Sequence, residues 1–136
     1  MGLAERRAAK KFESDVFPEI QKKIDEAAGY HVPVEVRWDD LCADGYAHMY
    51  EEAWSKVFFI PLMRALEAIT VDEIGKSALI AGLRSVVVLN QGSVFYPDAM
   101  ATLREGVLTL GHEPCTNIED IHDRARAIQA VLEAGL

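Results

Sequence analysis

The stretch SVVVLNQ, residues 85–91, decides the fold class. It is short, rich in β-branched valine and bounded by Gly82 and Gly92, which is typical of a buried strand. The segment before it predicts a short helix over 71–81, opened by a capping box from Thr70 to Glu73 and ended by Gly82. The chain therefore combines a helix and a buried strand within about twenty residues.

A hairpin is expected after this strand. The segments AMATL (99–103) and VLTLGHE (107–113) flank Arg104, Glu105 and Gly106, with glycine where a positive φ is needed. A last helix follows a cap at Thr116–Glu119 and carries its apolar residues on one face: Ile121, Ala125, Ile128 and Leu132. Three consecutive strands with short connections predict an antiparallel sheet.

Two helices and one strand are expected before residue 70. The first helix covers roughly 4–28, with Phe12, Val16, Ile20 and Ile24 at steps of four, a kink near Pro18 and a C-cap at Gly29. The alternating segment HVPVEVRWD (31–39) predicts a strand. Both a parallel and an antiparallel pairing of this strand with the later strands are compatible with the sequence. A second helix covers about 46–69, and Pro61 predicts a kink or break within it.

The expected fold is therefore α+β, in the order α-β-α-α-β-β-β-α. We predict an antiparallel sheet of about four strands with helices packed mainly on one face. The 136 residues are the size of a single domain, so residues 1–136 are expected to form one globular unit.

Charge and hydropathy narrow the class of partner. A formal net charge of −8 repels nucleic-acid backbones and suits a basic protein partner. The longest strictly apolar run, VFFIPLM (57–63), is far shorter than the roughly 20 residues of a membrane span. No basic segment followed by an apolar one opens the chain, and we expect a cytoplasmic protein that binds neither nucleic acid nor membrane.

Motifs for catalysis and metal binding are absent or incomplete. The chain has no GxSxG, GxxxxGK[ST] or GxGxxG pattern, and Cys42 and Cys115 have no CxxC partner. His48 and Glu52 lie one helical turn apart, but no further ligand has a defined spacing. We therefore favour a non-enzymatic protein and expect neither a metal nor a cofactor.

The segment RWDDLCADGYAHMYEE, residues 37–52, is the candidate binding surface. Acidic side chains outnumber basic ones there, and aromatic residues among charges are typical of protein interfaces. The opposing interpretation is a solvated loop and helix start. The candidate binding residues are Trp38, Asp39, Asp40, Asp44, Tyr46, His48, Tyr50, Glu51 and Glu52.

Three hypotheses of function remain. The broad apolar stretch around Phe58, Phe59 and Leu62 must face either the core on more than one side or another subunit, and the second possibility predicts self-association, for example as a homodimer. The acidic segment predicts an inhibitor or immunity-type protein for a basic partner such as a nuclease toxin. The alternative is a small-molecule enzyme or ligand-binding protein, with a polar pocket near His48, His112 and Cys115.

Overall fold

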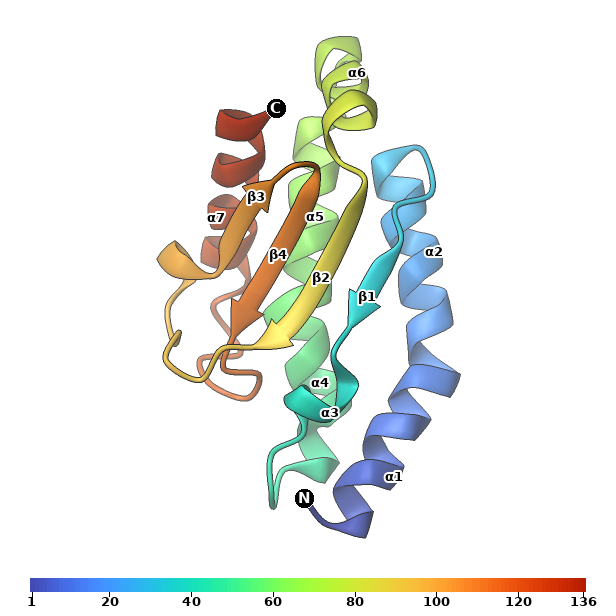
Figure 1. The fold of residues 1–136 in the computed structure, drawn as a ribbon, viewed down its shortest axis with the longest axis vertical. Coiled ribbons are helices and arrows are strands. Elements are labelled where there is room, and N and C mark those ends of the chain that lie inside the picture. The colour runs from blue at the N-terminus through green and yellow to red at the C-terminus, as the bar shows by residue number, and fades with distance from the viewer.

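One layer of helices covers one face of a four-stranded sheet (Figure 1). The computed structural model describes residues 1–136. The strands are β1 (Val34–Val36), β2 (Ser85–Asn90), β3 (Ala101–Arg104) and β4 (Val107–His112), in the sheet order β1-β2-β4-β3. The predicted α+β class and the helices on one side of the sheet are confirmed.

The sheet is mostly parallel, so the prediction of an antiparallel sheet was wrong. Strand β1 pairs with β2 in parallel, and β2 pairs with β4 in parallel, with Val34 opposite Val86 and Val86 opposite Leu108. Only β3 and β4 are antiparallel. The physical reason is that residues 91–100 carry the chain to the outer edge of the sheet, so that β3 becomes the edge strand and the hairpin inserts β4 beside β2.

The predicted hairpin itself is confirmed. Glu105 and Gly106 connect β3 and β4 with φ values of 51° and 81°, and two adjacent positive φ values are characteristic of a two-residue type I′ turn. Glycine tolerates this conformation without steric penalty. The local sequence is therefore sufficient for this one antiparallel pair.

Both long helices contain a π-helical turn just before a proline. Helix α1 (Leu3–Lys11) runs through a π turn (Phe12–Val16) into α2 (Phe17–Ala28), which Gly29 ends with a φ of 85°. Helix α4 (Tyr50–Trp54) likewise continues through a π turn (Ser55–Phe59) into α5 (Ile60–Ile69). Proline lacks an N–H and its ring clashes with the preceding turn, and the wider π turn relieves both problems. The predicted breaks at Pro18 and Pro61 therefore take this form.

Aromatic side chains join the two π turns. The ring of Phe12 lies 5.2 Å from that of Trp54 and 6.0 Å from that of Phe59, measured between centroids. Phe17 adds contacts to Phe59 at 5.4 Å and to Trp38 at 5.1 Å. This cluster fixes α1 and α2 against the α4–α5 helix.

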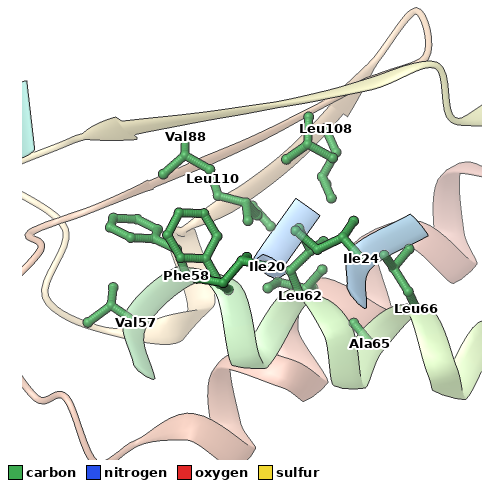
Figure 2. Close-up of a cluster of buried hydrophobic side chains, with 14 of the residues drawn as sticks. Ile20, Ile24, Val57, Phe58, Leu62, Ala65, Leu66, Val88, Leu108 and Leu110 are labelled. Carbon is green, nitrogen blue, oxygen red and sulfur yellow. The ribbon is translucent and has the colours of Figure 1, made fainter. Parts of the chain in front are cut away.

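The core lies between this helical layer and the sheet. Figure 2 shows Phe58 and Leu62 directed toward Val88 and Leu110 of the sheet, with Ile20 of α2 alongside. The residues predicted to mediate self-association, Phe58, Phe59 and Leu62, are all fully buried in this core. Their side chains are covered by the chain's own sheet and helices, so they offer no surface to a second copy.

Two helices complete the fold, and the predicted capping box from Thr70 to Glu73 was wrong, because Asp72 caps the helix instead. Helix α6 (Glu73–Gly82) begins after Asp72, whose carboxylate accepts a hydrogen bond from the Gly75 N–H at 2.7 Å. Thr70 instead follows α5, and its hydroxyl lies within hydrogen-bond distance of the carbonyls of Leu66 at 2.9 Å and Ala27 at 3.0 Å, to which it donates its one proton. The last helix, α7 (Ile121–Gly135), packs beside α5. No helix has both the length and the apolar character needed to cross a bilayer.

Candidate functional site

The acidic segment lies at the end of the molecule where the chain begins (Figure 1). The carboxyl ends of the parallel strands point toward this end, and β1 leads directly into the short helix α3 (Trp38–Leu41). Trp38 was predicted to continue the strand, but it is the first residue of α3. A loop and a 3-10 turn (Ala47–Met49) then connect α3 to α4.

Asp39 and Asp40 form the most open part of this segment. Both side chains are exposed and line a surface hollow of about 450 Å³ together with Glu13, Arg37 and Trp38. No cation lies within ion-pair distance of either carboxylate, and Glu13 forms an ion pair with Lys10 at 3.6 Å. We call Glu13, Trp38, Asp39 and Asp40 the acidic surface.

Asp44 and its neighbour Gly45 contact the first five residues of the chain. The terminal ammonium lies 3.8 Å from the Asp44 carboxylate, and the Gly45 N–H donates to the Glu5 carboxylate at 3.1 Å. This backbone hydrogen bond lowers the pKa of Glu5 below its usual range. The bond from Gly45 to Glu5 therefore helps to hold α1 against the loop, whereas the Asp44 side chain is 81% exposed and its long ion pair adds little.

Tyr50 is buried and belongs to the framework of the segment, whereas Tyr46 is 46% exposed. The Tyr50 hydroxyl donates to the Ala43 carbonyl at 3.0 Å and accepts from the Ala43 N–H at 2.8 Å. Its ring stacks on Trp54 at 4.3 Å, and burial raises the pKa of Tyr50 to about 12. Tyr50 closes the loop onto α4 and is not available to a partner, contrary to its prediction as a binding residue.

His48, in the 3-10 turn before α4, and Glu51 and Glu52, in the first turn of α4, are exposed. His48 and Glu52 form no hydrogen bond or ion pair with each other; Glu52 instead lies 3.6 Å from Lys56, which also contacts Glu119 at 2.6 Å. His48 and Glu51 share a small hollow of about 170 Å³ with Lys11. The spacing that suggested a ligand pair therefore brings the two side chains into no joint contact.

His112 and Cys115 lie close to each other in the chain but present no open site. His112 is fully buried; its Nδ1 donates to the Glu113 carbonyl at 2.6 Å, which leaves Nε2 to accept from Arg124 at 3.4 Å. Burial, and then the charge of Arg124, lower the pKa of His112, while burial raises the pKa of Cys115 to about 11. A histidine that is shut off from solvent and a thiol that stays protonated cannot act together as a general base and a nucleophile.

The structure does not bring His48 together with His112 or Cys115. None of the five principal hollows of the surface is lined by His112 or Cys115. No group of three or more His, Cys, Asp and Glu side chains has an arrangement that could hold a metal ion. No principal hollow of the surface therefore joins His48 to His112 or Cys115.

Two residues of this end of the molecule were missed in the sequence. Glu13 reaches the acidic surface only because α1 and its π turn pack beside α3, and nothing in its own neighbourhood indicates that. Arg124 is fully buried, and its guanidinium donates to the carbonyls of Thr116 at 3.0 Å and Asn117 at 2.6 Å. Its position on the apolar face of α7, between Ile121 and Ile128, was the available signal.

Comparisons with protein-family models, with curated proteins and with solved structures find no match for this chain.

Proposed function

We propose that the protein binds a basic protein partner through the acidic surface. The observation that supports this function is the pair of exposed carboxylates of Asp39 and Asp40, which form no ion pair and share one hollow with Glu13, Arg37 and the half-buried ring of Trp38, so that acids outnumber the single cation there. Solvated acids are usual on a protein surface, but an aromatic ring beside a hollow adds apolar area that a partner side chain can cover. A lysine or arginine of the partner fits this combination of charge and ring.

The charge of the whole chain favours the same kind of partner as the hollow does. The net charge of −8 attracts a basic protein over long distances, and the unpaired carboxylates set the orientation in which it docks. The specific form of the proposal is an inhibitor of the immunity type, which covers the basic working surface of its partner. In that form, equimolar addition of the protein suppresses the partner's activity.

The proposal is tested by co-purification from the native cells with matched charge variants. Wild-type protein should retain a basic partner, and Asp39→Lys combined with Asp40→Lys should lose it. The control is Glu67→Lys with Glu133→Lys, which changes the net charge equally at two exposed residues near the carboxyl-terminal ends of α5 and α7, at the opposite end of the molecule. Equal retention by both variants, or no retained basic protein, would contradict the proposal.

A further inference from the structure

Two loops that are distant in the sequence form one hydrogen-bonded unit. Residues 91–96 follow β2 and residues 113–117 follow β4, and both loops lie beyond the carboxyl ends of these strands (Figure 1). We call them the paired loops. Two consecutive carbonyls of the first loop accept hydrogen bonds from the second, each at 2.8 Å: Val94 from the Glu113 N–H and Phe95 from the Asn117 side-chain amide. Neither loop can therefore leave its place without breaking bonds to the other.

Two fully buried side chains, His112 and Arg124, anchor the second of these loops. Nη2 of Arg124 donates to the carbonyls of Thr116 at 3.0 Å and Asn117 at 2.6 Å. Nδ1 of His112 donates to the Glu113 carbonyl at 2.6 Å. The two side chains thus hold both ends of the loop, one from β4 and the other from α7.

No acid neutralises the buried guanidinium of Arg124. Its Nη2 lies 3.4 Å from Nε2 of His112, and no carboxylate lies within ion-pair distance of it. The nearby Glu113 carboxylate accepts instead from the Cys115 N–H at 3.2 Å and from the Thr116 hydroxyl. Because charges interact strongly in a protein interior, a second positive charge beside this guanidinium would be strongly repelled.

The groups that act on His112 come from several elements. Burial, and then the charge of Arg124 on α7, lower the pKa of His112, whereas Glu113 opposes this effect. The neighbour of His112 in register on β2 is Asn90, which carries no charge, and the first of the paired loops has no carboxylate or cation. Asp120, just before α7, acts on Arg124. His112 is therefore neutral while it stays buried, and acid favours any form in which its ring reaches solvent.

We infer that His112 and Arg124 form an acid-sensitive switch, which opens the paired loops together while the sheet stays folded. Protonated His112 leaves the guanidinium of Arg124, and its hydrogen bond to the Glu113 carbonyl is lost. The loops open as one unit because they are bonded to each other. This inference goes beyond the proposed function, because it concerns other residues and holds whether or not the acidic surface binds a partner.

Hydrogen exchange at pH 7 and pH 5, read by mass spectrometry and corrected for the intrinsic effect of pH, tests the switch. Each pH unit below about 6.5 favours the form with a solvated histidine by up to tenfold. Between the two pH values, exchange in both paired loops should therefore rise by about tenfold, while the amides of β2 and β4 stay protected. Unchanged exchange in the loops, a rise in only one of them, or an equal rise in the strands would overturn the inference.

Two histidine variants separate His112 from a general effect of acid. His112→Gln removes the titrating ring, keeps a neutral side chain that can donate and accept, and should abolish the rise in exchange. The matched control is His122→Gln, which removes an exposed histidine two residues before Arg124 and should leave the rise unchanged. A rise that persists in His112→Gln, or that disappears in His122→Gln, would contradict the switch.

The wild type alone gives a second test, which also serves if His112→Gln does not fold. The ring signals of the four histidines can be followed by NMR as the pH is lowered. The His112 ring should become protonated over the same pH range in which the amides of the paired loops lose protection. Loops that open while His112 remains neutral, or a protonated His112 in closed loops, would overturn the inference.

Discussion

The hydroxyl of Tyr50 offers a direct test of how the acidic segment is held. Tyr50→Phe removes two hydrogen bonds to the backbone of Ala43, at 2.8 and 3.0 Å, and leaves the stacking on Trp54 in place. Each hydrogen bond contributes about 0.5–1.5 kcal/mol, so we expect a loss of about 1–3 kcal/mol in the free energy of unfolding. For a chain of this length, that lowers Tm by roughly 4–10 °C.

The assay is thermal unfolding followed by circular dichroism, supported by urea titration. Tyr46→Phe is the matched control, because Tyr46 lies in the same segment and its hydroxyl forms no hydrogen bond within the chain. The Tyr50 hydroxyl should also make stability depend on alkaline pH. Its pKa of about 12 lies above the unfolded value near 10, so its contribution is complete below pH 10 and is lost as the pH rises through 12.

Two results would refute this reasoning. If Tyr50→Phe melts within about 1 °C of the wild type, the hydroxyl does not hold the loop that carries Asp44. If Tyr46→Phe loses as much stability as Tyr50→Phe, the loss reflects the segment as a whole and not the two bonds to Ala43.

Three further predictions concern the core and the loop after β4. Phe58→Ala should lower the free energy of unfolding by about 3–5 kcal/mol in urea titration, whereas Tyr96→Ala, at an exposed position, should stay within about 0.5 kcal/mol. His112 has a lowered pKa, so its contribution is complete above pH 6.5 and should decline as the pH falls below that value; His112→Gln should flatten this part of the stability curve. Cys115, with a pKa of about 11, should react with iodoacetamide at pH 8 much more slowly in the folded protein than in urea, as mass spectrometry would show.

The strands were predictable where local residues determine the structure. Val86 and Val88 alternate into the core within a short β-branched run, and Gly106 supplies the positive φ of the hairpin. The parallel pairing of β2 with β4 depends instead on the path of residues 91–100 around the edge of the sheet. A long-range path of this kind leaves no periodic signal, so the orientation could not be predicted.

The helix breaks were partly predictable. Pro18 and Pro61 indicate an interruption because proline lacks the N–H that a helix needs. Whether the chain kinks, restarts or widens into a π turn depends on what packs beside it, and here Phe12 and Phe59 of the two π turns pack against each other. The form of each break is therefore a tertiary property.

In the candidate site, too, the features that depend on tertiary packing could not be predicted from the local sequence. The exposure of Asp39 and Asp40 follows from their charge and could be expected. Whether Phe58 faces the core or a second copy could not be decided from the sequence, and the burial of Tyr50 was not expected, because a broadly apolar helix shows which residues avoid water but not which element covers them. In the folded chain, the sheet covers Phe58 and leaves it no surface for a second copy.

The rate of association with the partner at low salt tests the central claim most directly. If the acidic surface guides and holds a basic protein, Asp39→Lys with Asp40→Lys should slow association by about tenfold or more at low ionic strength, with a smaller effect at high salt. The control Glu67→Lys with Glu133→Lys has the same net charge and should slow association much less. Equal rates for the two variants at low salt would contradict the account, because only the net charge of the chain would then matter.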